Sequence, residues 1–351
     1  MKTEIPAMRP EDFRHLHAIT KSIATPNPKI YWSDLLLTAI VSWTSLFIAL
    51  CSPRLSYVQV FATFFSGVAF YRGVNFIHEI SHHPRNLRHF TVAYNVLFGF
   101  YARIPAYFGN SHADHHSVRK FGTQLDPEYE IWSQRHPLNV LRPLIASFIS
   151  PVLLFCRIAI IPVIYLIAGK SFQIKVIRRF SSIVMNFDYQ YSNTHPEVLT
   201  KVRNLDLAAM AFTWTIISIW FHFKMPIDAL VIHYLTLVLG NMLGSFRALG
   251  VHRYTSGFVE QNAQQQFLDS VSIRETLFSS IWAPLNSNFH SIHHLLPHLP
   301  YHSMLEADRI LQNDPILQKY YLTTVESSLW ASLSTLYKRA RINQLERVQR
   351  S

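Results

Sequence analysis

Two pairs of long apolar runs, each joined by only a few residues, constrain the fold of this chain more than any other feature. The first pair spans 34–50 and 56–77, and the second spans 205–223 and 226–250. Each run approaches the roughly 20 residues that cross a bilayer as a helix. Connections this short join antiparallel neighbours, so each pair predicts a membrane hairpin. The sequence therefore predicts an all-α integral membrane protein with four transmembrane helices in two hairpins.

The composition supports a membrane protein and excludes several other classes. Hydrophobic residues make up 49% of the 351 residues and charged residues only 15%, with a mean hydropathy of +0.12. Soluble domains carry nearer a quarter charged residues. The two cysteines, Cys51 and Cys156, lie far apart and form no CxxC motif. This excludes a disulfide framework, a zinc ribbon and a thiolate iron–sulfur site.

The positive charge indicates how the hairpins are oriented. The formal net charge is +11, yet no motif typical of nucleic-acid binding accompanies it, so we expect no nucleic-acid partner. The hairpin tips carry one basic residue each, Arg54 and Lys224, whereas residues 78–204 carry 14. Basic loops remain in the cytoplasm. We therefore expect both termini and the catalytic face of this multi-pass protein to be cytoplasmic.

These boundaries divide the chain into six segments. We expect a cytoplasmic N-terminal segment at 1–33, the first hairpin at 34–77, a cytoplasmic or interfacial region at 78–204, the second hairpin at 205–250, a cytoplasmic region at 251–314 and a basic C-terminal helical tail at 315–351.

Two further stretches, 90–108 and 151–169, are also about as long as a membrane span. Arg103 with Pro105 interrupts the first, and Arg157 with Pro162 interrupts the second. Because an arginine in the middle of a span is costly in lipid, we expect both stretches to form interfacial helices.

Three clusters of histidine flank the predicted hairpins. On a helix, positions i, i+3 and i+4 share one face, so each HxxHH motif predicts three imidazoles that point the same way. In the first cluster, His83 lies five residues after His78 and should miss the face that His78 and His82 share. The clusters are His78, His82 and His83; His112, His115 and His116; and His290, His293 and His294.

Eight imidazoles exceed what one metal ion can use, so the clusters predict two metal ions. Imidazole without thiolate suits iron, copper, zinc or nickel, and iron is the usual carrier of O₂ chemistry among them. Neutral imidazoles leave the metal charge uncompensated, and nearby carboxylates should orient them. Glu79 and Asp114 lie inside the clusters, and Asp126 and Glu128 follow the second. We expect Glu79 and Asp114 to support the ligands.

The motifs HEISHH, HADHH and HSIHHLLPHLPYH resemble, in order and spacing, the three histidine boxes of the membrane fatty acid desaturase family, over roughly residues 30–310. The resemblance implies a non-haem centre with two iron ions that uses O₂ as co-substrate. It adds His252, in RALGVHRY, to the ligands, and His83 and His298 are weaker candidates. The implied iron ligands are His78, His82, His112, His115, His116, His252, His290, His293 and His294.

The resemblance also implies an activity and partners. The activity would be O₂-dependent desaturation of a fatty acyl lipid within the membrane. The HxxxHH form of the first box is similar to the acyl-lipid enzymes of the family. The chain has no HPGG segment, so electrons would come from a separate ferredoxin or cytochrome b5-type donor.

Three alternatives remain open. A related di-iron hydroxylase or ketolase would share the same boxes, because placement of the substrate decides between the outcomes. A membrane zinc peptidase fits HExxH literally, with Glu79 as general base, but leaves both HxxHH boxes unexplained. A lipid-binding or metal-sensing protein without catalytic activity would use the same clusters.

Overall fold

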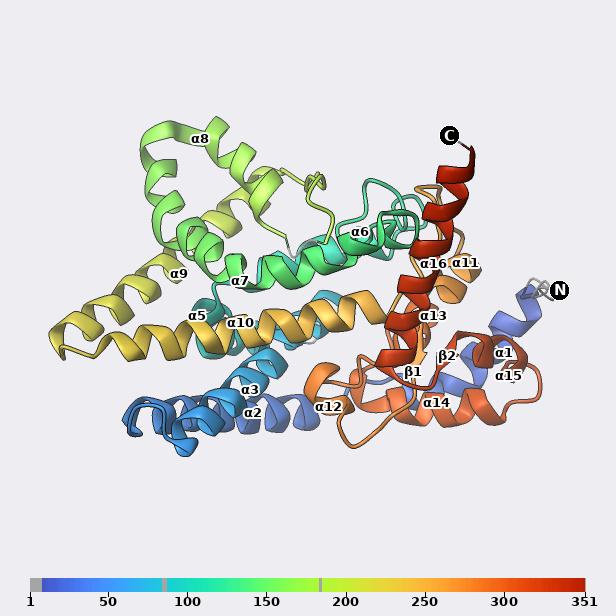
Figure 1. The fold of residues 1–351 in the computed structure, drawn as a ribbon, viewed down its shortest axis with the longest axis horizontal. Helices are drawn as coiled ribbons and strands as arrows, with labels where there is room; N and C mark the ends of the chain where they lie inside the picture. Colours follow the sequence, from blue (N-terminus) through green and yellow to red (C-terminus); the bar gives the residue numbers. More distant parts are fainter. Residues whose placement is uncertain (1–7, 84–86, 183–184, 351) are drawn as a thin grey trace. The chain divides into compact units, whose positions relative to one another are not determined.

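The computed structural model describes residues 8–83, 87–182 and 185–350. The described chain is mainly helical, and its one sheet has two strands of two residues each (Figure 1). Five of the described helices are long and apolar enough to cross a membrane, one more than the sequence predicts. The all-α membrane fold is thus confirmed.

The chain divides into two compact units, each described here by itself. The first, which we call the membrane unit, comprises Pro28–Ala113 and Arg142–Ser245. The second, which we call the terminal unit, comprises Met1–Asn27, Asp114–Leu141 and Phe246–Ser351.

The first predicted hairpin is the pair α2 (Pro28–Cys51) and α3 (Tyr57–His82). The Ser56 hydroxyl caps α3 by accepting a hydrogen bond from the backbone amide of Gln59 at 3.2 Å. Near the other end, Arg72 on α3 and Asp34 on α2 form an ion pair at 2.5 Å. The hairpin thus pairs these half-buried polar residues and leaves large apolar side chains outside, as a helix facing lipid requires. The exposed apolar residues of α2 include Leu36, Leu37, Ile40 and Phe47.

The second predicted hairpin is the pair α9 (Pro196–His222) and α10 (Ile227–Gly250). Pro196 starts α9 at a first-turn position, where its missing N–H costs no hydrogen bond. The turn between the helices contains Lys224 with a φ of 48°. Polar side chains inside this unit find partners across elements, because His233 on α10 hydrogen-bonds the Arg103 guanidinium at 3.1 Å.

The fifth candidate span, Pro137–Tyr165, overlaps the stretch expected to be interfacial. It includes α7 (Arg142–Phe155) and the π-helix η6 (Cys156–Ile160), and α8 (Ile161–Phe180) continues from it. Arg157, whose charge was the argument against a span, is buried and lies 3.0 Å from the carboxylate of Asp206 on α9. An arginine paired in this way does not exclude a membrane helix.

The other interrupted stretch, 90–108, lies in a series of short helices. These are α4 (Arg88–Tyr94), the π-helix η2 (Asn95–Gly99), α5 (Phe100–Ala102) and the 3₁₀ helix η3 (Ala106–Ser111). Arg103 ends α5 in the left-handed conformation with a φ of 62°. The stretch is absent from the five candidate spans of the described chain, and its interfacial position stays a prediction.

The terminal unit packs short elements around an apolar core. Leu16, Phe289, Ile292 and Leu311 are among the side chains fully or almost fully buried there. The described elements are α1 (Pro10–Thr20), η1 (Lys21–Ile23), η4 (Trp132–Gln134), η5 (Pro137–Leu141), α11 (Ala263–Asp269), β1 (Ser272–Ile273), α12 (Ser279–Trp282), α13 (His290–Leu295), η7 (Tyr301–Ser303), α14 (Met304–Asn313), α15 (Gln318–Tyr321), η8 (Leu322–Thr324), β2 (Val325–Glu326) and α16 (Leu329–Arg350). Strands β1 and β2 are parallel, with Ser272 opposite Val325.

Candidate metal centre

The first histidine box forms the last turn and a half of α3. His78 and His82 are four residues apart, so the helix places them on the same face, and their ring centroids are 4.9 Å apart. The box is therefore continuous with a candidate membrane span. The preceding helical turns fix both side chains to a rigid element, which suits ligands that must keep a fixed geometry.

A close backbone contact brings His112 to this pair. Gly109 lies against Ile77, and a Cβ at Gly109 would come within 2.9 Å of the Ile77 Cγ1 atom and 3.2 Å of its carbonyl oxygen. Only glycine allows this approach without displacement. Three residues later, the Nε2 atom of His112 lies 3.0 Å from that of His82. The membrane unit thus holds a trio of histidines, His78, His82 and His112.

The terminal unit holds a quartet of histidines, His115, His252, His290 and His294. One ring nitrogen from each lies within 4.8 Å of the others, and all four side chains are buried. The Nε2 atom of His290 is 2.9 Å from that of His252 and 3.1 Å from that of His294. The quartet therefore joins residues separated by up to 179 positions, 294 minus 115, into one imidazole cluster.

The histidines of the second box divide between the two clusters, a division that helical spacing alone does not predict. The helix α6 (His112–His115) has only four residues and ends inside the motif. His112 joins the trio, His115 joins the quartet, and His116 lies 2.9 Å from His293, measured between Nε2 atoms. The helix ends at His115, yet the ring of His116 remains beside the quartet and stacks on His294 at 4.5 Å between centroids.

The donor sets fit metal ions by their spacing and chemistry. Bonds of about 2.1 Å from a metal to imidazole place neighbouring nitrogens at about 3.0 Å when the bonds are perpendicular. The separations between Nε2 atoms in the trio, the quartet and the pair of His116 and His293 are 2.9, 3.0 and 3.1 Å. Nitrogens gathered this closely suit first-row transition metals.

Asp126 orients His115 by contacting the Nδ1 side of its ring. Its two carboxylate oxygens lie 2.9 and 3.0 Å from the His115 Nδ1 atom, and both side chains are fully buried. The backbone amides of Gly122 and Glu128 donate to the same carboxylate at 2.9 Å each. Burial disfavours protonated His115, but the charge and hydrogen bond of Asp126 together with the charge of Glu128 outweigh it, so the pKa of His115 is raised.

Asp269 supports His252, and sequence reasoning missed it. Its Oδ2 atom is 3.7 Å from the His252 Nδ1 atom, and both groups are buried. The hydroxyl of the neighbouring Ser270 donates to the Gln266 carbonyl at 2.8 Å and can accept from His252 Nδ1 at 3.4 Å. An antiparallel bridge between His252 and Ser270 sets this register. No local motif marks Asp269, because the bridge joins segments that are distant in sequence.

The two carboxylates expected to support ligands behave differently. Glu79 is buried, with one oxygen 3.3 Å from His78 Nδ1 and the other accepting a hydrogen bond from the Tyr31 hydroxyl at 2.5 Å. Asp114 is partly exposed and forms an ion pair with Lys120 at 2.7 Å. Glu79 is thus placed to orient a histidine, whereas a lysine engages Asp114.

The two weaker candidate ligands lie in different surroundings. His83 ends α3, is buried and packs edge-on against Tyr31 at 6.5 Å between ring centroids. It has left the face that His78 and His82 share, as the spacing predicts. His298 is exposed. Neither belongs to the clusters found among the described residues.

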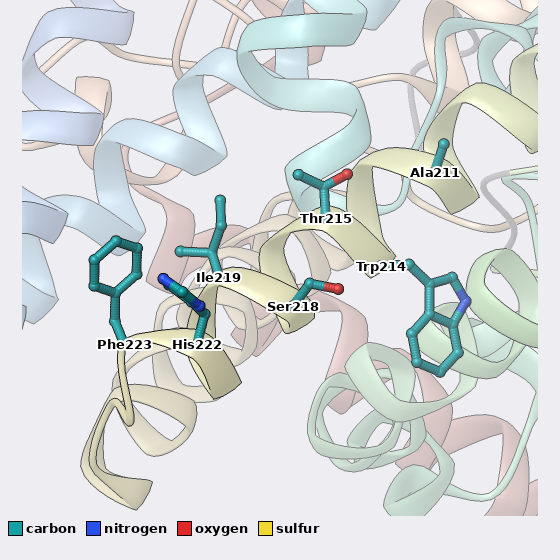
Figure 2. A pocket seen from close by; sticks show the side chains of 7 residues that line it. All are labelled: Ala211, Trp214, Thr215, Ser218, Ile219, His222 and Phe223. Carbon is teal, nitrogen blue, oxygen red and sulfur yellow. The ribbon is translucent and has the colours of Figure 1, made fainter.

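A separate hollow of about 600 Å³ lies along one face of α9 (Figure 2). None of the residues that line it is a predicted metal ligand, so it does not form part of the candidate centre. They are Ala211, Trp214, Thr215, Ser218, Ile219, His222 and Phe223.

Comparison with known proteins agrees with this geometry. The sequence model of the family described as fatty acid desaturase matches residues 55–328, more than three quarters of the chain. The chain is also 31% identical over 341 residues to a ceramide hydroxylase of Caulobacter vibrioides (strain NA1000 / CB15N), and the alignment covers 95% of each sequence.

Proposed function

This chain belongs to the fatty acid desaturase family, and we propose that it is an oxygen-dependent oxidoreductase that hydroxylates an aliphatic chain of a ceramide-like lipid. The observation that carries the reaction type is the similarity to a ceramide hydroxylase along 95% of both sequences. The gathered histidines support the use of a metal and O₂.

The proposed cofactor is a pair of iron ions. The trio His78, His82 and His112 and the quartet His115, His252, His290 and His294 would hold them, with His116 and His293 as further donors. Bound iron would supply the activation of O₂ that an unactivated C–H bond requires. Asp126, Asp269 and Glu79 would orient the imidazoles and fix which ring nitrogen faces the metal, because each lies beside a ring Nδ1 atom.

Hydroxylation and desaturation consume the same reactants. In hydroxylation, one C–H bond becomes C–OH, and O₂, two electrons and two protons yield one water. In desaturation, two C–H bonds on neighbouring carbons are lost, and the same reactants yield two waters. The placement of the chain beside the oxidant decides between them. Desaturation, the main expectation from the sequence, is the second candidate because the family description favours it.

The electrons would come from a ferredoxin or cytochrome b5-type donor at a cytoplasmic face. The net charge of +11 favours the approach of an acidic carrier. The other partner would be membrane lipid, since five helices of the described chain can cross a bilayer and the substrate is itself a lipid.

Lipid analysis of a host that contains ceramide tests the proposal. Host cells would express the chain with a reductase and a donor, and His115→Ala would serve as the inactive control. A gain of one oxygen atom in ceramide, absent from the control, supports hydroxylation. A loss of two hydrogens instead identifies a desaturase. An unchanged lipid profile from iron-loaded, reduced protein contradicts both.

Metal analysis distinguishes the oxygenase from the zinc peptidase alternative. Two iron ions per chain are expected for the oxygenase, whereas one zinc ion per chain would favour a peptidase that uses HExxH.

A further inference from the structure

Helix α16, the last helix of the chain, is fastened at two points near the ends of candidate membrane spans. The Ser332 hydroxyl donates to the carbonyl oxygen of Gly250, the last residue of α10, at 2.6 Å. The Asn343 side-chain amide donates to the carbonyl oxygen of Ser133 at 2.8 Å, four residues before the span that begins at Pro137. All these residues belong to the terminal unit.

The distance between the two points fixes the direction of α16. Ser332 and Asn343 are 11 positions apart, about 16 Å along a helix. Leu329 adds a close contact at the first point, because a Cβ at Gly250 would come within 2.3 Å of its Cδ1 atom. Within the terminal unit, α16 thus runs from the last residue of α10 to the segment just before Pro137.

The face of α16 that packs inward is small and apolar. Ser332, Leu336 and Ala340 are buried at intervals of four residues. The opposite side exposes seven residues within about 140° of arc, and we call it the outer face of α16. These residues are Trp330, Tyr337, Lys338, Arg341, Ile342, Leu345 and Gln349.

The outer face combines apolar and basic side chains. Trp330 is 78% exposed and Leu345 is 56% exposed, although large apolar side chains gain free energy on leaving water. Lys338 and Arg341 lie between them, and no acidic residue is among the seven. Tryptophan, tyrosine and basic residues with long aliphatic stems are the side chains that suit the boundary between headgroups and acyl chains.

We propose that α16 is an interfacial anchor whose outer face lies on anionic lipid at the cytoplasmic surface. The apolar residues would insert among the headgroups, and Lys338 and Arg341 would pair with phosphates. The anchor would hold the terminal unit, with its histidine quartet, against the bilayer from which the substrate comes. This role goes beyond the proposed reaction and does not require it.

The test places a probe on the outer face. Leu345→Cys in a Cys51→Ser, Cys156→Ser background would carry an environment-sensitive fluorophore, and the iron-loaded full chain would be reconstituted in bilayers. We expect acrylamide to quench the probe at least about twofold less in phosphatidylcholine containing phosphatidylglycerol than in phosphatidylcholine alone. Its emission should shift to shorter wavelength in the anionic bilayer.

Charge reversal supplies the matched comparison. Lys338→Glu with Arg341→Glu should restore quenching in the anionic bilayer. Arg309→Glu with Lys319→Glu changes the net charge equally on exposed residues of the same unit and should leave quenching low. Iron content and the thermal midpoint of each variant verify that it folds.

Two results would overturn the anchor. One is a probe that acrylamide quenches equally in both bilayers. The other is an α16 charge reversal that raises the KM for the reduced electron donor while the probe at position 345 remains in water, which would assign the outer face to a protein partner.

Discussion

The Nδ1 atom of His115 lies 2.9 Å from a carboxylate oxygen of Asp126, and neither side chain is exposed to solvent. A neutral imidazole that donates from Nδ1 keeps its lone pair on Nε2. The carboxylate thereby selects the tautomer that can bind a metal from the side of the quartet. Two backbone amides hold this carboxylate, so the preference is built into the turn between Gly122 and Glu128.

Replacing Asp126 by Asn should therefore weaken the quartet more than its small change in shape suggests. We expect a loss of 10- to 100-fold in iron affinity or turnover, roughly the cost of removing a residue that orients a ligand. Iron content and activity of the purified variant measure this. Asp114→Asn is the control, since Asp114 pairs with Lys120 and should change either quantity by less than about threefold. Equal losses in the two variants would refute a special role for Asp126.

Gly109→Ala should disturb the trio through packing alone. The added methyl group would meet Ile77 at 2.9 Å, and overpacking of this kind costs about 1–3 kcal/mol. We expect His112 to move away from His78 and His82, with a lower iron content at unchanged expression. Gly240→Ala is the matched control, because its nearest neighbour would be Tyr71 Cβ at an ordinary 3.5 Å. Normal iron content in Gly109→Ala would show that the contact is dispensable.

Asp206→Asn should destabilise the membrane unit. It leaves the buried Arg157 without the carboxylate that lies 3.0 Å away, and breaking a buried pair from one side costs about 3–5 kcal/mol. The thermal midpoint of the protein in detergent should fall accordingly. Asp188→Asn is the control. Asp188 is 93% exposed and lies 3.8 Å from its partner Arg179, so the thermal midpoint of this variant should hardly change. A similar midpoint for both variants would contradict this account.

The docking of α1 should depend on pH through Asp314. Burial raises the pKa of this carboxyl, but hydrogen bonds from His15 at 2.6 Å and from the amides of Leu317 and Ile316 outweigh it, so the pKa lies below the ordinary 3.8. The stabilisation is thus complete above 3.8 and is lost as the pH falls through the folded-state value.

Hydrogen exchange in α1 measures this dependence. Asp314→Asn should speed exchange relative to the wild type near neutral pH, and the difference should vanish in acid, where the wild-type carboxyl is protonated. A difference that stays constant with pH would assign the effect to shape rather than charge.

The sequence predicted the parts of this structure that depend on local repetition. Apolar runs of span length predicted both hairpins, and histidine spacing predicted the residues of the trio and the quartet except His252, which the family resemblance implied. Which ring joins which cluster was not predictable from spacing, because α6 ends after four residues and its periodicity has no effect on His116.

Pairings between residues far apart in the sequence also could not be predicted from sequence patterns. Arg157 looked too costly for a membrane helix because its partner, Asp206, is 49 residues away. Asp269 carries no motif, and the bridge between His252 and Ser270 and the hydrogen bonds from Thr255 to its carboxylate position it. In each case a charge is interpretable only together with a partner that the fold supplies.

The third box shows how much constraint lies between its histidines. Ser291 hydrogen-bonds the hydroxyls of Ser272 at 2.7 Å and Thr324 at 2.8 Å, and Ile292 is completely buried in the core of the terminal unit. Both residues occupy the variable positions of HxxHH. A sequence search that scores only the histidines would overlook these two residues. Related chains should therefore be classified by the residues at these two positions as well as by the histidines themselves.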